Sequence, residues 1–255
     1  QVEKVNFNEK ADAANLMNGF VNNVTEGMIK EVVDAKSISS VTLAMFINAV
    51  YFHGDWQYTF SKTYNSTFHG SAGDRQIEFM RRETEFRVNT DNAFGTALLL
   101  PYKDESYRFF IMMPNQKYNM TQLRDSLTGK ALLDVLNSTE NTDVTVRIDQ
   151  VIVPKFRVDS NMDAVGVLKK LGVSTLFGSG ADLSKISSDP MSVSSIKHVA
   201  VIEVSELGTT AAAATVVGFT ALAMPSRPPL TITIDHPFIY GIMKNDDILF
   251  IGQFV

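Results

Sequence analysis

Three features of the sequence predict an α+β fold. Residues 9–29 and 115–140 carry apolar side chains at helical spacing, which indicates amphipathic helices. Residues 97–114 and 238–255 each contain two apolar runs separated by a short polar stretch, which is typical of a β-hairpin. The chain has 255 residues, 45% of them hydrophobic and 20% charged, so it can bury the core of one large domain or of two small ones.

The chain begins with patterns for one strand and one helix. Residues 2–7 alternate between apolar and polar side chains and are predicted to form a short strand. Asn8 is expected to cap the helix at 9–29, and Gly27 stands near the end of that helix. The stretch 41–52 is almost wholly apolar, which favours a central strand buried on both faces.

The remaining elements follow from the same two periodicities. A third helix is predicted at 162–171, where Gly172 suits a C-terminal cap. Strands are predicted where apolar residues alternate or run together between polar turns. These strands cover 67–69, 76–88, 97–101, 107–114, 143–153, 230–234, 238–243 and 248–255.

Composition argues against several classes of function. The formal net charge is −5 and the isoelectric point is about 5.4, which disfavours a dedicated nucleic-acid-binding protein. No apolar run is long enough to cross a membrane, and the absence of cysteine excludes disulfides and thiolate chemistry. No nucleophile elbow, zinc-protease pattern or phosphate-binding glycine motif is present, so no enzyme activity, metal or cofactor is predicted. Four Asn-x-Ser/Thr sequons suit a secreted glycoprotein: Asn23, Asn65, Asn119 and Asn137.

The stretch 203–229 has an unusual composition. Glu206-Leu207-Gly208 precedes a run of small residues, Thr209 to Thr215, that contains four consecutive alanines. The glycine marks a place where the backbone needs a positive φ. Alanine favours helix, whereas threonine and valine favour strand. The segment therefore suits either an exposed loop or a strand inserted between two others, and an alanine-rich helical turn is the simpler alternative.

The ten residues Glu206–Thr215 resemble the hinge of the reactive-centre loop in inhibitory serpins. That hinge reads glutamate, any residue, glycine, threonine or serine, any residue, then small residues up to a threonine. Other motifs along the chain are similar to further serpin signatures. They are Asn48–Trp56, Pro154-Lys155-Phe156, the run from Gly172 to Ile186, His236-Pro237-Phe238 and Ile248–Gly252.

The resemblance implies a single serpin domain over residues 1–255, with a large mixed sheet A, sheets B and C, and covering helices. The reactive-centre loop would span 206–229 and be either exposed or inserted into sheet A. Trp56 would lie at the breach, the top of sheet A where the loop enters. Asn48 and His198 would lie at the shutter in the middle of that sheet, where His198 is expected to hydrogen-bond near Asn48. The hinge residues would be Glu206, Gly208, Thr209, Ala211, Ala212, Ala213, Ala214 and Thr215.

One departure from the family pattern lies at the N-terminus. Complete serpins carry a long helical region before the strand expected at 2–7, and this sequence lacks that N-terminal third. Without it, a large sheet would expose apolar area on its back, which favours association. The chain is therefore expected to be a fragment of a longer product, or to pair with the missing segment or with another copy.

The resemblance also implies a mechanism of protease inhibition. A serine or cysteine protease attacks the loop and forms an acyl-enzyme, and the freed loop inserts into sheet A and traps the protease. Family spacing places the scissile bond at Leu222-Ala223, which suits chymotrypsin-, elastase- or cathepsin-like proteases. Met224 and Arg227 are alternatives, and Pro228 disfavours cleavage after Arg227. A non-inhibitory carrier, chaperone or storage serpin, or an inactive fragment, stays open as the second interpretation, and no nucleic acid or membrane is expected as a partner.

Overall fold

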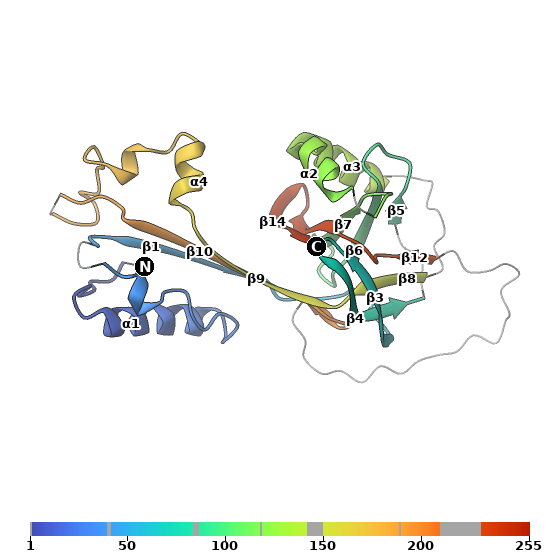
Figure 1. Ribbon diagram of the computed structural model, residues 1–255, viewed down its shortest axis with the longest axis horizontal. Helices are drawn as coiled ribbons and strands as arrows, with labels where there is room; N and C mark the ends of the chain where they lie inside the picture. Colours follow the sequence, from blue (N-terminus) through green and yellow to red (C-terminus); the bar gives the residue numbers. More distant parts are fainter. Residues whose placement is uncertain are drawn as a thin grey trace, which may run out of the picture. The chain divides into compact units, whose positions relative to one another are not determined.

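The structure is a computed structural model that describes residues 2–39, 42–83, 87–117, 119–141, 150–188, 190–209 and 231–255. The chain divides into two compact units, and each combines helices with β-strands (Figure 1). Unit 1 comprises Gln1–Phe52 and Arg157–Ile202, and unit 2 comprises His53–Phe156 and Glu203–Val255. Among the described residues the strands form three sheets, two of them with both parallel and antiparallel pairs, which confirms the predicted α+β class.

Unit 1 is built on three strands and the helix that covers them. The strands are β1 (Met45–Tyr51), β9 (Phe156–Asp163) and β10 (Ser195–Val204), the last of which ends in unit 2. β1 runs parallel to β10, and β9 also pairs with β10. Helix α1 (Lys10–Val24) lies along one face of the β1–β10 pair (Figure 1). Its buried residues recur every three or four positions, which keeps them on one helix face: Ala13, Ala14, Met17 and Val21.

Short elements complete unit 1. Helix α4 (Val165–Lys170) follows β9, and Gly172 just beyond it has a φ of +91°, as its predicted capping role requires. Two single turns of 3₁₀ helix, η1 (Ala35–Ser37) and η2 (Thr175–Phe177), lie in the connections.

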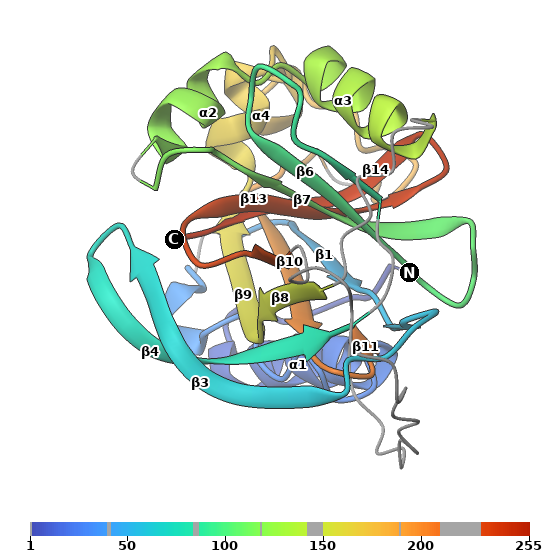
Figure 2. The same ribbon diagram turned by 90° about the vertical axis from the view of Figure 1, so that its right-hand side faces the viewer.

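Among its described residues, unit 2 contains two whole sheets, one end of the third sheet and two helices. One sheet has the order β12-β8-β4-β3, and the other has the order β14-β13-β7-β6-β5. Helices α2 (Met120–Ser126) and α3 (Gly129–Asn141) cover one face of the five-stranded sheet, and the β3–β4 hairpin lies on its other side (Figure 2). The strands are β3 (Lys62–Gly70), β4 (Gly73–Arg82), β5 (Arg87–Asn89), β6 (Thr96–Pro101), β7 (Tyr107–Met113), β8 (Gln150–Pro154), β12 (Thr231–Thr233), β13 (Phe238–Lys244) and β14 (Asp247–Phe254).

Aromatic side chains fill the space between the sheets of unit 2. Phe156 lies at the centre, with its ring 4.8 Å from that of Phe254, 5.0 Å from Tyr240 and 5.9 Å from Phe238. Most of these rings meet edge-on or tilted, which is the arrangement that the charge distribution of an aromatic ring favours. The Pro154-Lys155-Phe156 motif therefore contributes its phenylalanine to the core.

The two predicted hairpins are confirmed. β6 and β7 pair antiparallel from Thr96 opposite Met113, and β13 and β14 pair antiparallel from Phe238 opposite Phe254. In both cases the apolar pattern is local and the turn is short, so neighbouring segments of the sequence can pair without help from the rest of the fold.

Several predicted boundaries are wrong. Residues 2–7 form no strand, because no described residues pair with them and Val2 is exposed. Asn8 does not cap α1, since Glu9 occupies the N-cap position and makes no side-chain capping bond. The helix ends at Val24 instead of continuing to 29. The strand prediction at 2–7 fails because a strand needs a neighbouring strand to pair with its backbone groups. Alternation of apolar and polar residues alone does not supply that neighbour.

The central apolar strand also differs from the prediction. β1 covers only Met45–Tyr51, its residues are mostly half-buried, and Asn48 is exposed. Among the described residues β1 pairs with β10 alone, so its other edge has no neighbour there. The apolar run 41–52 thus marks a strand, but not one buried on both faces.

Other predicted elements change in length. The strands expected at 67–69 and 76–88 are the long hairpin of β3 and β4, followed by the separate strand β5. The helix expected at 115–140 is split between α2 and α3, and Met162 belongs to β9 instead of the helix predicted at 162–171. Of the strand expected at 143–153, residues 143–149 lie outside the described part of the chain. In the described parts of the chain, every helix is too short or too polar to traverse a membrane.

Candidate functional site

The candidate site lies in unit 2, where the chain leaves β10 and begins the predicted hinge. Strand β11 (Gly208–Thr209) pairs antiparallel with the end of β10, with Thr209 opposite Val204. It also pairs antiparallel with β2 (Gly54–Asp55), with Thr209 opposite Gly54. Thr209 has no exposed surface. The first described residues of the hinge are therefore held between two other strands.

Gly208 is required at this point because the neighbouring backbone is very close. A Cβ atom on Gly208 would lie 2.1 Å from the carbonyl oxygen of Gly54 and 2.7 Å from the Cα atom of Asp55. Gly208 is not among the glycines that adopt a positive φ. The sequence therefore indicated the correct residue for the wrong reason, since close packing and not backbone conformation demands it.

Trp56 holds the turn that leads into the hinge. Its side chain is 1% exposed, and its indole Nε1 donates a hydrogen bond of 2.8 Å to the carbonyl oxygen of Ser205. Its backbone N–H donates to the carbonyl oxygen of Leu207 at 2.9 Å. The indole also stacks on the ring of Tyr102 at 4.7 Å between centroids. The only tryptophan of the chain is thus fixed against residues just before β11.

Tyr102 reaches the hinge directly. Its hydroxyl lies 2.6 Å from the hydroxyl of Thr209, and both residues are buried. Burial raises the pKa of Tyr102 well above its ordinary value, and the hydrogen bond with Thr209 only partly opposes this effect. The phenol is therefore neutral and can both donate and accept a hydrogen bond.

An ion-paired lysine holds the glutamate of the hinge. The Nζ atom of Lys155 lies 2.9 Å from an oxygen of Glu206 and 2.9 Å from an oxygen of Glu78. Burial would raise the pKa of Glu206, but the hydrogen bond and the charge of Lys155 outweigh burial and lower it. Burial would likewise lower the pKa of Lys155, but its two carboxylate partners raise it. Both groups are therefore charged at neutral pH.

The two predicted shutter residues meet in unit 1. Asn48 and His198 occupy the same register position of the parallel pair β1–β10, and the Nδ2 atom of Asn48 lies 3.1 Å from Nδ1 of His198. The contact expected between these side chains is present. An amide N–H can only donate in this contact, so Nδ1 of His198 is the acceptor.

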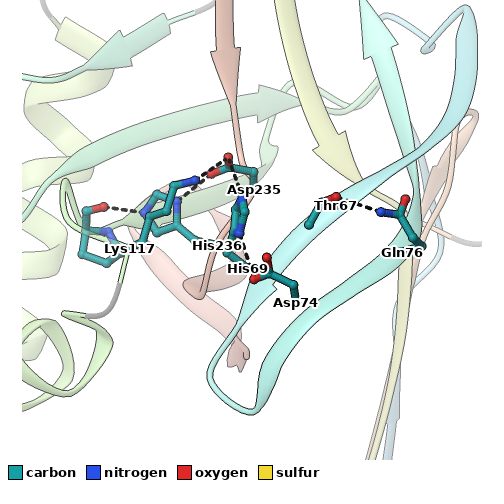
Figure 3. A network of polar contacts seen from close by, with 8 residues as sticks. Thr67, His69, Asp74, Gln76, Lys117, Asp235 and His236 are labelled. Carbon is teal, nitrogen blue, oxygen red and sulfur yellow. Dashed lines mark hydrogen bonds and ion pairs between the residues drawn. The ribbon is translucent and has the colours of Figure 1, made fainter.

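The His236-Pro237-Phe238 motif belongs to a separate polar network in unit 2 (Figure 3). The two ring nitrogens of the buried His236 face oxygen atoms, Oδ1 of Asp235 at 2.8 Å and the carbonyl of Pro114 at 2.8 Å. Lys117 and His69 approach the other oxygen of Asp235 at 3.4 and 3.9 Å. Burial would raise the pKa of Asp235, but the hydrogen bond from His236 and the charge of Lys117 lower it. The network fixes the connection between β12 and β13 and lies apart from the hinge contacts.

Other predicted site residues fall outside the described part of the chain. They are Ala211, Ala212, Ala213, Ala214, Thr215, Leu222, Ala223, Met224 and Arg227. Of the predicted glycosylation sites, Asn23 and Asn65 are exposed, whereas Asn119 and Asn137 are half-buried. Across the described residues, no histidine, aspartate and glutamate side chains gather into a group that could hold a metal ion.

Three site residues escaped the sequence reasoning. Tyr102 lies in the polar turn of a hairpin, where nothing marks it as a partner of the hinge. Ser205 contributes its carbonyl oxygen to Trp56, which any residue could supply, and its hydroxyl donates to the Gly208 carbonyl oxygen at 3.0 Å. Lys155 stands in a motif noted as a family marker. Its two carboxylate partners, Glu78 and Glu206, lie 77 and 51 positions away in the sequence, so no local pattern links them to Lys155.

Comparisons with known proteins agree with this geometry. The sequence model of one family, described as serpin (serine protease inhibitor), matches residues 1–255. Iripin-2 of Ixodes ricinus is 30% identical over 260 residues, covering 99% of this chain and 64% of the relative. Serpin B3 of Homo sapiens is 31% identical, with 99% of this chain and 66% of the relative covered. The chain thus spans about two thirds of the length of the curated relatives it matches.

Solved structures give the same result. The crystal structure of Serpin48 of the insect Tenebrio molitor is 32% identical and superimposes with a TM-score of 0.80, covering 98% of this chain and 66% of that one. The structure of native protease nexin-1 with heparin is 29% identical and gives a TM-score of 0.84, with 99% of this chain and 68% of that one covered.

Proposed function

Because the chain belongs to the serpin family, whose members are generally protease inhibitors and not enzymes, we propose that it traps a serine or cysteine protease as a suicide substrate. The protease cleaves the reactive-centre loop at 206–229 and forms an acyl-enzyme, and the freed loop adds to the sheet as a strand. The observation that carries this proposal is the position of β11, whose two residues already pair with β2 and with the end of β10.

Extending β11 requires the β1–β10 pair to open. β10 pairs directly with β1 from Ser195 to Val201, and it pairs with β11 only at Val204. The hydrogen bond between Asn48 and His198 crosses the β1–β10 pair and must break when a strand enters there. We assign these two residues the shutter role on this ground. Trp56 takes the breach role, because its contacts hold the turn through which the loop enters.

The composition of the loop supports insertion. The residues from Gly208 to Thr215 are small and include no proline, so they can enter a sheet without clashes or missing backbone donors. The scissile bond is assigned to Leu222-Ala223, with Met224 and Arg227 as alternatives, and the targets are chymotrypsin-, elastase- or cathepsin-like proteases. A carrier, chaperone or storage role, or an inactive fragment, is the outcome if no trapping occurs.

Further parts of the proposal concern the setting of the protein. We assign residues 1–255 to a single serpin domain, because the family model spans both units. An extracellular, glycosylated protein is supported by exposed sequons at Asn23 and Asn65. A separate N-terminal segment of the serpin fold, or another copy, is the proposed structural partner. Exposed apolar side chains on α1 support such a partner: Leu16, Phe20 and Val24.

The test is incubation of the chain with chymotrypsin, elastase and cathepsin L. Inhibition predicts a covalent complex that survives denaturing electrophoresis, and mass spectrometry of the released peptide should show cleavage after Leu222. Thr209→Arg should abolish the complex and leave clean cleavage, because a long charged side chain cannot occupy the fully buried position of Thr209. Thr63→Arg, at an exposed position of β3, is the matched control and should trap normally. A complex that persists in Thr209→Arg would overturn the insertion mechanism.

A further inference from the structure

Two buried hydroxyls join the hinge to the body of unit 2. The Tyr102 and Thr209 hydroxyls lie 2.6 Å apart, in residues that are 1% and 0% exposed. A hydrogen bond in such a place is strong and costly to break, because water does not reach it easily. The partners are 107 positions apart in the sequence, so the contact exists only when β11 is seated.

Tyr102 is itself held firmly. It forms an isolated antiparallel bridge with Trp56, and its ring stacks on the indole with an angle of 16° between the planes. Its backbone N–H donates to the carbonyl oxygen of Tyr107 at 3.2 Å, across the turn between β6 and β7. The phenol therefore has few rotamers available, and its hydroxyl is aimed at one place.

Most other contacts of the site hold residues before β11, and Ser205 holds Gly208, because its N–H and its hydroxyl each donate to the Gly208 carbonyl oxygen at 3.0 Å. Trp56 holds Ser205 and Leu207, and Lys155 holds Glu206. Tyr102 instead contacts the side chain of Thr209, the last described residue of the hinge. The two residues of β11 offer few backbone pairs, so the buried side-chain hydrogen bonds from Ser205 to Gly208 and between Tyr102 and Thr209 are a large part of what seats them.

We propose that Tyr102 is a positioning residue whose hydroxyl keeps Thr209 seated between β2 and the end of β10, and that this seating starts insertion of the cleaved loop. The second part rests on the proposed inhibitory function. A seated hinge supplies the first paired residues of the new strand, so further residues add to an existing pair instead of forming the first one. Insertion competes with deacylation of the protease, and any slowing of insertion releases more cleaved chain for each complex formed.

Hydrogen exchange at β11 tests the seating without reference to any protease. Removing one hydroxyl from a buried pair should speed exchange of the Gly208 and Thr209 amides about tenfold. The variants are Tyr102→Phe, which keeps the stacked ring, and Thr209→Val, which replaces the hydroxyl by a methyl group of similar size. The double variant joins two apolar groups, so exchange should return to within about threefold of the wild-type rate. Tyr240→Phe is the matched control, because Tyr240 is also buried in unit 2 but belongs to β13, which pairs with β7 and β14.

The outcomes separate the two parts of the proposal. If the β11 amides exchange as slowly in Tyr102→Phe as in Tyr240→Phe, Tyr102 does not keep Thr209 seated, and the first part of the proposal is overturned. Thr209→Val gives the same decision if Tyr102→Phe does not fold. With a protease that the wild type traps, Tyr102→Phe should raise the ratio of cleaved chain to complex about tenfold, and the double variant should restore it. An unchanged ratio together with faster exchange overturns the link to insertion. If the wild type traps no protease, the proposed function fails, and the exchange data still decide whether Tyr102 seats the hinge.

Discussion

The hinge glycine offers the sharpest test of the site, because the geometry leaves no room for even one methyl group. In Gly208→Ala the new Cβ would lie 2.1 Å from the Gly54 carbonyl oxygen, 2.7 Å from the Asp55 Cα and 2.9 Å from the Gly54 carbonyl carbon. Ordinary contacts need about 3.5 Å, so β11 and β2 would have to separate by roughly 1.4 Å. All three atoms belong to backbone, which cannot rotate away as a flexible side chain could.

The expected loss is about 1–3 kcal/mol in the free energy of unfolding, the usual range for overpacking in a well-packed site. The loss in the free energy of unfolding stays within this range because β11 can detach from β2 and from the end of β10. The chain then gives up the pairs at Gly208 and Thr209 and the hydrogen bond to Tyr102, instead of straining the whole sheet. Exchange of the β11 amides should therefore rise more than exchange in β6, β7 and β13.

The assay is urea unfolding followed by the fluorescence of Trp56, the only tryptophan of the chain. Gly129→Ala is the matched control, since Gly129 lies at the start of α3 in the same unit and a Cβ there meets nothing within 4 Å. That control should be neutral or stabilising by up to about 1 kcal/mol, as alanine favours helix over glycine. An unchanged midpoint and unchanged β11 exchange in Gly208→Ala would refute the claim that the hinge is seated against β2.

Three further predictions concern the contacts around the hinge and the polar network. Trp56→Phe removes the 2.8 Å hydrogen bond to Ser205 and part of the stack on Tyr102. It should lower the free energy of unfolding by about 2–4 kcal/mol, as measured by urea unfolding followed by circular dichroism. The control is Tyr64→Phe at an exposed position. An unfolding midpoint equal to that of the control would contradict the anchoring role of Trp56. Glu206 has a pKa below its ordinary 4.5, so its stabilising contribution is present above pH 4.5 and is lost as the pH falls through the lowered folded-state value. Glu206→Gln should therefore lower the free energy of unfolding by about 1 kcal/mol at pH 7, a figure reduced for partial exposure, and by little at pH 3. Equal losses at the two pH values would argue against the ion pair with Lys155 as the cause. Asp235 has a pKa below its ordinary 3.8, so its stabilising contribution is also present above that pH and is lost as the pH falls through the lowered folded-state pKa. Asp235→Asn should lower stability by about 2 kcal/mol in thermal unfolding at pH 7. The difference from the wild type should shrink as the pH falls below 3.8, because the contribution of the charged carboxylate is lost through its lowered pKa. No change at pH 7 would contradict the role of the network.

Local patterns predicted the elements whose pairing is also local. The hairpins β6–β7 and β13–β14 join segments that follow each other in the sequence, so alternation and a short turn are sufficient. The strand expected at 2–7 fails for the opposite reason. Its alternation is equally clear, but no described strand pairs with it, and Val5 and Phe7 instead pack against the core that α1 covers.

The helix α1 shows a similar limit. Its apolar residues cover more than one face, and the set of Ala13, Ala14, Met17 and Val21 faces the core, whereas Leu16, Phe20 and Val24 are exposed. Periodicity can indicate that a helix is amphipathic, but when apolar residues occupy two faces it does not say which face the sheet covers.

Sequence motifs were sufficient to indicate the family, whose model matches residues 1–255. The assignment of Glu206, Gly208 and Thr209 to a hinge stays a prediction, which rests on the small side chains and the glycine that entry into a sheet requires. The partners of that hinge were decided only by tertiary structure. Trp56 meets Ser205 across 149 positions, and Tyr102 meets Thr209 across 107. A hydrogen bond between such distant residues produces no periodic pattern in the sequence. It depends on where the strands of two separate parts of the chain end, and not on the spacing of apolar residues within either part.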